Sequence, residues 1–114
     1  MTISDQGKRI PKHKYKLRFM PVALEEWKGL DGSVAKPLKK LLAKRLDEPH
    51  VPGAELHDNL AGCYKIKLLK QGVRLVYYVE DDELYVMVVA VDKRENSAVY
   101  TSAIARLAET LRKK

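Results

Sequence analysis

Residues 63–92 constrain the fold of this chain more than any other segment, because they contain three consecutive apolar stretches, and in the first of them apolar side chains alternate with lysines. Alternation with a period of two is typical of β-strands that bury one face. Gln71-Gly72 and Asp81-Asp82 interrupt the pattern and predict tight turns between neighbouring strands. The segment therefore predicts an antiparallel meander. Its strands are expected at about residues 63–69, 73–80 and 84–92.

One more strand and two helices are expected before this meander. The stretch KYKLRFM, residues 14–20, alternates in the same way and predicts a half-buried strand. Pro21 suits the first turn of a helix, and Gly29 suits its end. A second helix is expected from Ser33, as its N-cap, to a point just before Pro49, because leucines recur there at helical spacing. The two helices form an αα-hairpin.

A last helix is expected from Asn96 or Ser97 onward, with large side chains on one stripe. The members of this stripe are Tyr100, Ile104, Leu107 and Leu111. The order β-α-α-β-β-β-α predicts a small α+β domain with a mainly antiparallel four-stranded sheet. We expect this domain over residues 14–114, preceded by a flexible basic arm, residues 1–13, whose lysines and arginine would add at most weak phosphate contacts.

The charge balance indicates an anionic partner. Lysine and arginine total 22 against 15 acidic residues, for a net charge of +7, which favours nucleic acid or an acidic protein. Cys63 is the only cysteine, so no intramolecular disulfide is possible and a reducing, cytoplasmic setting is expected. The sequence contains no apolar run of about 20 residues and no secretory signal, so no membrane association is expected.

Many of the basic residues are expected on the outer face of the second helix. They are Lys36, Lys39, Lys40, Lys44 and Arg45. A solvated helix surface is the ordinary interpretation of such a face, and RNA binding is the alternative.

The meander is expected to carry different chemistry on its two faces, because successive side chains of a strand point in opposite directions. With Gln71-Gly72 as a two-residue turn, Lys67 pairs with Val76 and Lys65 with Tyr78, on the same face as Arg74. The opposite face is predicted to be the core face, packed on the αα-hairpin. It collects Tyr64, Ile66, Leu68, Leu75, Tyr77, Val79, Leu84, Val86, Val88 and Ala90.

The partly apolar basic face is expected to be covered by the final helix or by a partner. Antiparallel pairing returns Lys93 and Arg94 to the end of the sheet where Arg74 lies, and places the acidic turn, residues 80–83, at the other end. Clustered positive charges repel one another, and a polyanion such as the RNA backbone would offset that repulsion. The expected cluster comprises Lys65, Lys67, Arg74, Arg94 and Tyr100.

This cluster has the residue types needed for RNA cleavage without a metal or cofactor. The sequence contains no glycine-rich phosphate loop and no convincing Ser-His-Asp set, and the spacing of His50, His57 and Cys63 matches no common zinc site. Lysine and arginine stabilise phosphate charge directly, and a lysine among like charges is a candidate base for the ribose 2′-OH. Tyr100 has two interpretations, core packing in the helix stripe or contact with substrate.

The segments CYKIKLLKQGVRLVYYV and VAVDKRENSAVY, with LEEWKGL in the preceding hairpin, resemble the RelE toxins of bacterial toxin–antitoxin pairs over about residues 14–112. The resemblance implies a cytoplasmic, ribosome-dependent endoribonuclease. It would cut mRNA in the ribosomal A site without a metal and be neutralised by a RelB-like antitoxin. Operator DNA would be contacted only through the toxin–antitoxin complex.

The resemblance also implies roles for the cluster. Lys65 and Lys67 would bind the RNA backbone, with Lys67 as candidate base, and Arg74 would stabilise the phosphate. Arg94 would stabilise the phosphate too or protonate the leaving group, and Tyr100 would stack on or position the substrate.

Further contacts with RNA are expected around this set, from Lys70, Lys93 and Asn96. Asn96 is a departure, because family members can carry another arginine there. Two alternatives remain: a gyrase-inhibiting toxin on the same fold, and a non-catalytic subunit that binds operator DNA, for which we find no recognition helix. An acidic, amphipathic antitoxin segment is expected to cover Val76, Tyr78 and Met87.

Overall fold

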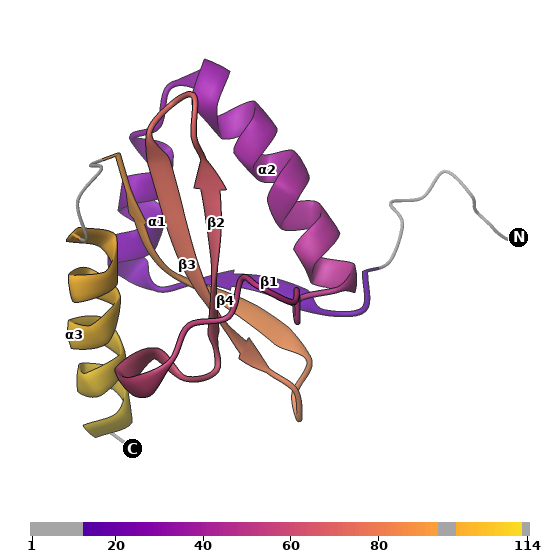
Figure 1. Cartoon of the computed structure of the whole chain (residues 1–114), viewed down its shortest axis with the longest axis vertical. Coiled ribbons are helices and arrows are strands. Elements are labelled where there is room, and N and C mark those ends of the chain that lie inside the picture. Colours follow the sequence, from indigo (N-terminus) through magenta and orange to yellow (C-terminus); the bar gives the residue numbers. More distant parts are fainter. Residues whose placement is uncertain (1–12, 94–97, 113–114) are drawn as a thin grey trace, which may run out of the picture.

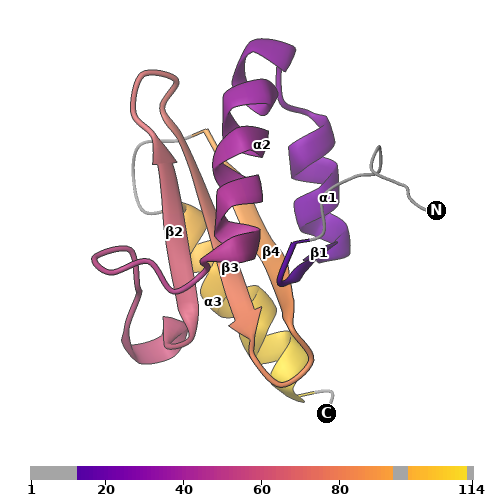
Figure 2. The same ribbon diagram turned by 90° about the vertical axis from the view of Figure 1, so that its right-hand side faces the viewer.

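The protein is described by a computed structural model that covers residues 13–93 and 98–112. A four-stranded sheet has two helices on one face and a third on the other (Figures 1 and 2). The elements are β1 (Lys16–Phe19), α1 (Pro21–Lys28), α2 (Gly32–Asp47), a 3₁₀ turn η1 (Asp58–Leu60), β2 (Cys63–Leu68), β3 (Val73–Glu80), β4 (Tyr85–Asp92) and α3 (Ala98–Arg112). The α+β fold and its element order are confirmed. None of the helices described is long and apolar enough to span a membrane.

The sheet has the strand order β1-β4-β3-β2 and is mixed. The meander β2-β3-β4 is antiparallel as predicted, whereas β1 lies at the edge, parallel to β4. The αα-hairpin connects β1, at one edge of the sheet, to β2, at the other edge. The short β1–α1 connection, marked by Pro21 at the start of the helix, puts α1 directly against β4.

The hairpin register differs from the predicted one, although the faces do not. Residues 69–72 form a four-residue turn, closed by Gly72 at a positive φ of 67°. Consequently Lys67 pairs with Arg74 and Lys65 with Val76. The shift relative to the predicted two-residue turn is two positions, and a shift of two keeps every side chain on its own face. Lys65, Lys67, Arg74 and Val76 therefore share a face as expected.

A β-bulge corrects the predicted core face near the end of β4. Tyr77 pairs with Val88 but Val76 pairs with Ala90, so Val89 is an extra residue on β4. The extra residue reverses the faces beyond it, which places Ala90 on the α3 side of the sheet and Val91 in the core under α1 and α2. The prediction for Leu84 is also wrong, because it lies in the turn before β4 at φ 56° and is 41% exposed.

Two apolar clusters stabilise the domain, one on each face of the sheet. The larger cluster joins Leu38 and Leu42 of α2 and Ala23 of α1 to the sheet, as predicted for the core face. The smaller one packs Val99 and Ala103 of α3 on the opposite face, where Val76, Tyr78 and Met87 lie. The sequence predicted that either the final helix or a partner would cover this face, and in the structure the final helix, α3, covers it. Val76 is completely buried in this cluster, and the contact of an antitoxin segment with this face stays a prediction.

The helix ends differ slightly from their predicted positions. Asp31, not Ser33, occupies the N-cap position of α2, and the Ser33 hydroxyl donates a hydrogen bond of 2.7 Å to the Asp31 carboxylate. The predicted start of the last helix, at residues 96–97, lies outside the described residues, as does the predicted arm before His13. The imidazole Nδ1 of His13 lies 3.1 Å from a carboxylate oxygen of Asp47 at the end of α2.

Candidate functional site

The β2–β3 hairpin places three of the predicted site residues on one face. Lys67 and Arg74 are direct cross-strand partners, and Lys65 lies two residues along β2 from Lys67, opposite Val76. Same-face positions on a strand are separated by about 6.6 Å, so both lysines are within reach of one extended ligand. Like charges in direct cross-strand pairs destabilise a sheet. The arrangement is therefore better suited to an anion than to stability.

Access to this group is greatest at the end of the hairpin. Lys67 is exposed, whereas Lys65 and Arg74 are partly buried. A hollow of about 210 Å³ opens between Lys67, Arg74 and the turn. Arg74 is also paired across the sheet with Asp92 of β4, so a carboxylate flanks the arginine on the strand away from the lysines. Asp92 can offset charge only on the β4 side of Arg74. The β2 side, where Lys65 and Lys67 lie, therefore carries a net positive charge.

Tyr100 lies in the third position of α3 and is partly buried. It packs against the cluster that contains Val76 and Ala90, next to the strand positions of Lys65 and Arg74. Both interpretations of this residue are therefore compatible with its place: its ring contributes to packing and part of it stays accessible beside the basic face. The predicted stripe is wrong for Ile104, which is 36% exposed, because Val99 and Ala103 face the sheet instead.

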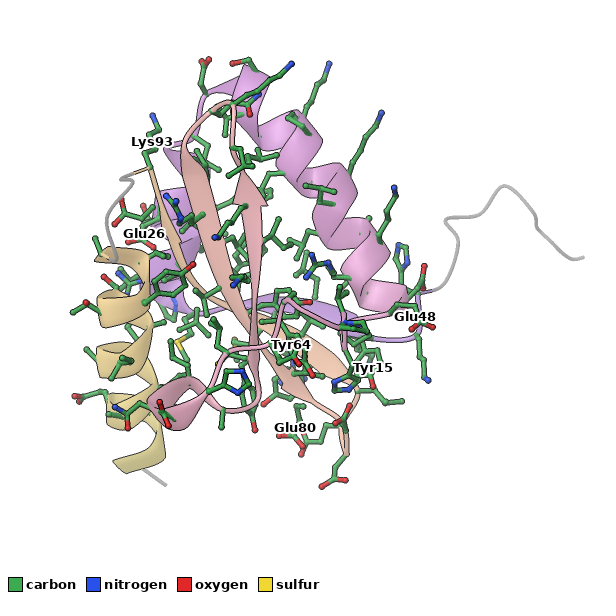
Figure 3. The ribbon with its side chains drawn as sticks, in the orientation of Figure 1. Tyr15, Glu26, Glu48, Tyr64, Glu80 and Lys93 are labelled. Carbon is green, nitrogen blue, oxygen red and sulfur yellow. The ribbon has the colours of Figure 1, made fainter. Side chains whose placement is uncertain are left out.

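The remaining predicted residues lie around the same end of the sheet. Lys93 is exposed after the end of β4, and Lys70 is exposed in the hairpin turn. Figure 3 shows Lys93 and Glu80 at opposite ends of the molecule, as predicted for the basic and acidic ends of the meander. Arg94 and Asn96 lie outside the described residues.

Arg45 of α2 supports the hairpin from the core face, so the prediction that it lies on the outer face of this helix is wrong. Its guanidinium donates hydrogen bonds to the Tyr77 hydroxyl at 2.8 Å and to the Lys65 backbone carbonyl at 3.2 Å. The Tyr77 hydroxyl in turn donates to the Pro49 carbonyl at 2.7 Å, and burial raises the pKa of Tyr77. These bonds fix β2 at Lys65, one of the candidate site residues. The one feature of the sequence that could have predicted this role is that Arg45 is the only arginine among the basic residues of this helix.

Arg106 and Glu26 hold α3 on the sheet, and this pair was also missed. The Arg106 guanidinium donates to both Glu26 carboxylate oxygens, at 2.9 and 2.8 Å, and to the Val89 carbonyl at 2.9 Å. Glu26 also accepts a bond of 3.0 Å from the Val91 N–H. The pair therefore satisfies backbone groups of β4 beyond the end of β1. The hydrogen bonds that Arg106 donates to Glu26 raise the pKa of Arg106.

The acidic end of the sheet contains a separate polar network. Asp81 accepts a bond of 2.7 Å from the Tyr15 hydroxyl and lies 2.8 Å from Nε2 of His50, while Nδ1 of His50 lies 2.8 Å from the Tyr64 hydroxyl. The bond to Asp81 raises the pKa of Tyr15 to about 12, and the bonds from Tyr15 and His50 lower the pKa of Asp81. This network joins the loop after α2 to the β3–β4 turn.

The histidines and cysteine considered for a metal site do not come together. His50 is in the network at the acidic end, whereas Cys63 is fully buried on the α3 side, where burial raises its thiol pKa to about 12. Within residues 13–93 and 98–112, no group of three or more His, Cys, Asp and Glu side chains is suited to holding a metal ion.

Comparison with known proteins gives one consistent family. Residues 17–98 match the family described as the ParE toxin of type II toxin–antitoxin system, parDE. The mRNA interferase toxin RelE of Escherichia coli K12 is 43% identical over 93 residues, which is 82% of this chain and 97% of that protein. A RelE-like toxin protein from Escherichia coli is 46% identical over 94 residues, covering 82% of this chain and 98% of the relative.

Solved structures agree with these relatives. The isolated E. coli RelE toxin superposes with a TM-score of 0.68 at 42% identity, covering 82% of this chain and 98% of that one. The toxin in the intact E. coli RelBE toxin–antitoxin complex has a TM-score of 0.68 at 41% identity, covering 72% of this chain and 99% of that one. The sequence, the element order and the superposition agree, and we conclude that this chain belongs to the RelE/ParE family of type II toxin–antitoxin toxins.

Proposed function

We propose that this protein is the toxin of a toxin–antitoxin pair and that it acts as a ribosome-dependent endoribonuclease on mRNA in the A site. The observation that carries the proposal is the cross-strand pair of Lys67 and Arg74, with Lys65 on the same face. Two relatives at 43% identity, from E. coli and Shigella flexneri, are named mRNA interferases. The basic face supplies what such a reaction requires from the protein, which is stabilisation of a phosphate.

The proposed reaction is the attack of a ribose 2′-oxygen on the adjacent phosphorus. A bond forms between the 2′-oxygen and phosphorus as the bond from phosphorus to the 5′-oxygen breaks. The products are a 2′,3′-cyclic phosphate and a free 5′-hydroxyl. One proton leaves the 2′-OH and one is delivered to the departing 5′-oxygen, and negative charge develops on the phosphate oxygens. Preorganised cations at those oxygens contribute most to such a step.

We assign roles to the residues from their positions on the sheet. Lys67, exposed at the end of the hairpin, is the candidate base or phosphate ligand, and Arg74 opposite it stabilises the phosphate charge. Lys65 holds the RNA backbone one step away along β2. Tyr100 positions the substrate from α3, where part of its side chain is accessible.

The remaining roles follow the resemblance. Arg94 supplies a second cation or the proton for the leaving group, and Lys70, Lys93 and Asn96 bind RNA around this set. Lys70 and Lys93 are exposed, as that role requires.

We also propose an antitoxin as the cellular partner. The E. coli relative has been solved as a RelBE complex and as a complex with an antitoxin peptide, and the toxins in both are at least 41% identical to this chain. With its net charge of +7, this protein suits a RelB-like antitoxin that carries acidic residues. Operator DNA would be reached only through such a complex, and the protein alone would act in the cytoplasm on mRNA held by the ribosome.

The test is primer extension on cellular transcripts after induction of the protein. Transcripts should be cut within codons in translated regions, and Arg94→Ala should lower cutting by about 10²-fold or more, as expected for loss of one electrostatic or acid–base group. Lys16→Ala is a suitable control, because Lys16 is an exposed lysine on β1 at the far edge of the sheet. Intact transcripts during growth arrest would rule out the proposed reaction.

The gyrase-inhibiting alternative retains one observation in its favour, which is the family match to ParE toxins. A DNA supercoiling assay with purified protein separates the two functions. Inhibition of gyrase by the wild type, with transcripts left intact, would favour the alternative.

A further inference from the structure

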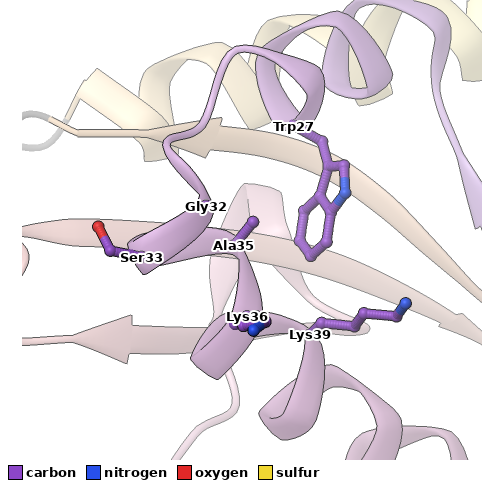
Figure 4. Close-up of a pocket in the computed structure, with 6 residues that line it drawn as sticks. All are labelled: Trp27, Gly32, Ser33, Ala35, Lys36 and Lys39. Atoms are coloured by element: carbon purple, nitrogen blue, oxygen red, sulfur yellow. The ribbon is translucent and has the colours of Figure 1, made fainter.

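A second basic surface lies on the helical face of the sheet, away from the hairpin group. Between α1 and α2 there is an open hollow of about 490 Å³, a size that accepts small ligands. It is lined by Trp27, Gly32, Ser33, Ala35, Lys36 and Lys39 (Figure 4). Figure 2 places both helices on one face of the sheet and α3 on the other. The hollow and the candidate catalytic group are therefore separate surfaces.

Trp27 gives this hollow a flat aromatic wall. Figure 4 shows its indole projecting from α1 toward the side chain of Lys39 on α2. Trp27 is only partly buried, and its ring packs on Phe19 with 5.5 Å between ring centroids and 59° between ring planes. A ring fixed by packing loses little entropy when a second flat group stacks on it. Nucleic-acid bases are such groups, and aromatic side chains bind unpaired bases by stacking.

The lysines of this surface form no ion pairs with other described residues. Lys36, Lys39 and Lys40 are exposed, and Lys36 lies three residues from Lys39 and four from Lys40, so both are its neighbours on the helix surface. In the part of the chain that the structure describes, none of them forms an ion pair, and no acidic residue lies three or four positions away from any of them. Their mutual repulsion weakens the helix, and an anionic ligand would remove it.

The hollow continues along α2 into a second depression. This depression, of about 610 Å³, is lined by Lys36, Pro37, Lys39, Lys40 and Ala43. Lys36 and Lys39 therefore border both depressions, and apolar surface lies on either side of them. An extended ligand that alternates flat apolar groups with anionic groups matches this pattern.

The anionic group belongs over the lysines and not at the start of α2. Asp31 occupies the N-cap position of that helix and carries a negative charge there, held by the hydrogen bond from Ser33. This carboxylate repels a phosphate at the helix end. Lys36 and Lys39 lie five and eight residues after Asp31 and line the same hollow as Trp27.

We propose that this α1–α2 surface binds single-stranded RNA, with one base stacked on Trp27 and the adjoining phosphate held by Lys36 and Lys39. The inference rests on the proposed function only for the choice of RNA as ligand. An acidic protein segment shares the negative charge but lacks the flat rings that the Trp27 wall accommodates. The surface would add an RNA contact on the face away from the reacting phosphate.

The chain contains one tryptophan, so its fluorescence reports on this surface alone. The full-length protein would be titrated with a short 2′-O-methylated oligouridine, which cannot be cleaved by 2′-OH attack. Saturable quenching of Trp27 fluorescence is expected, together with binding measured by anisotropy of the labelled oligonucleotide.

Charge variants test the contact. Lys36→Glu with Lys39→Glu should weaken the quenching transition at least tenfold and lower its salt slope by about 0.7, the value for loss of one single-strand phosphate contact. Lys36→Arg with Lys39→Arg should retain it. Lys14→Glu with Lys16→Glu reverses the same number of charges at exposed positions near the start of β1, and should leave the quenching transition within about threefold of wild type because long-range effects are screened.

Three results would overturn the inference. The first is oligonucleotide binding without any change in Trp27 fluorescence. The second is equal weakening by the two charge-reversal pairs, which would indicate net charge alone. The third is quenching by oligoglutamate at the same concentrations as oligouridine, which would indicate an acidic protein segment. Each leaves the transcript-cutting test unaffected, so failure of this surface and failure of the proposed function are distinguishable.

Discussion

The two ends of the sheet handle charge in opposite ways. At the acidic end, Asp81 accepts hydrogen bonds from Tyr15 and His50, so its charge is matched within the protein. At the basic end, Lys67 faces Arg74 directly across the strands, and Lys65 adds a third positive charge to the same face. The first arrangement stabilises a connection between segments, whereas the second lowers stability and favours an external anion. Changes at the two ends should therefore affect different measurements.

The largest effect is expected for Arg74→Ala, measured as RNA cleavage. Removing one cation that stabilises transition-state charge typically lowers the rate by about 10²-fold or more. Folding stability should stay within about 0.5 kcal/mol of wild type, because the variant removes both the like-charge pair with Lys67 and the opposite-charge pair with Asp92. Urea denaturation followed by fluorescence, alongside primer extension, checks both. A variant that unfolds while cleavage per folded molecule is unchanged would contradict the assignment.

Arg106→Ala should have the next largest effect, this time on stability. The variant leaves Glu26 partly buried without its cation and leaves the Val89 carbonyl without its donor. A loss of about 2 kcal/mol in the free energy of unfolding is expected, in the range for hydrogen bonds to charged groups. Arg112→Ala, at the end of the same helix, is the matched control. Equal losses of unfolding free energy in the two variants would show that the contact between Arg106 and Glu26 does not stabilise the fold specifically.

Lys67→Glu sharpens the comparison, because it converts the like-charge pair into an opposite-charge pair with Arg74. Cross-strand pairs of opposite charge stabilise a sheet by about 0.2–1 kcal/mol, so the free energy of unfolding should rise. Cleavage should fall to background in the same variant. Thermal unfolding and primer extension measure the two effects. A less stable Lys67→Glu protein would mean that the basic end is not under electrostatic strain.

The smallest effect concerns alkaline pH at the acidic end. The folded pKa of Tyr15 is about 12, above the ordinary value of 10.0, so the neutral hydroxyl is the form that folding favours. Its contribution is full below pH 10 and is lost as the pH rises toward 12. Because its partner Asp81 is exposed, a contribution below about 1 kcal/mol is expected.

In Tyr15→Phe, the free energy of unfolding should still decrease as the pH rises over this range, but less steeply than in wild type. Cys63, whose pKa is raised to about 12 from 9.0, destabilises the fold over the same alkaline range. Denaturation at pH 9 and pH 11 compares wild type with Tyr15→Phe. Identical pH dependence in wild type and Tyr15→Phe would remove Tyr15 from this account.

The sequence by itself determined the elements, the two faces of the meander and the positive character of one face. Alternation of period two assigns faces without any knowledge of the partner strand, and for that reason Lys65, Lys67 and Arg74 stayed together although the register moved by two positions. The family resemblance of the two strand segments was also visible in the residues. The elements, the faces and the charge of one face are all set by residues that are close in the sequence or that lie on the adjacent strand of the meander.

Only the tertiary structure decided the features that join distant residues. The bulge at Val89 moved Ala90 to the α3 side, and no local pattern marks a residue that is extra relative to its partner strand. Arg106 and Glu26 meet from helices 80 residues apart. Trp27 and Lys36 line one hollow because the α1–α2 turn brings two helices together. In each case the deciding interaction joins residues that are not neighbours in the sequence. Their spacing in the sequence does not determine how far apart they lie in the folded protein.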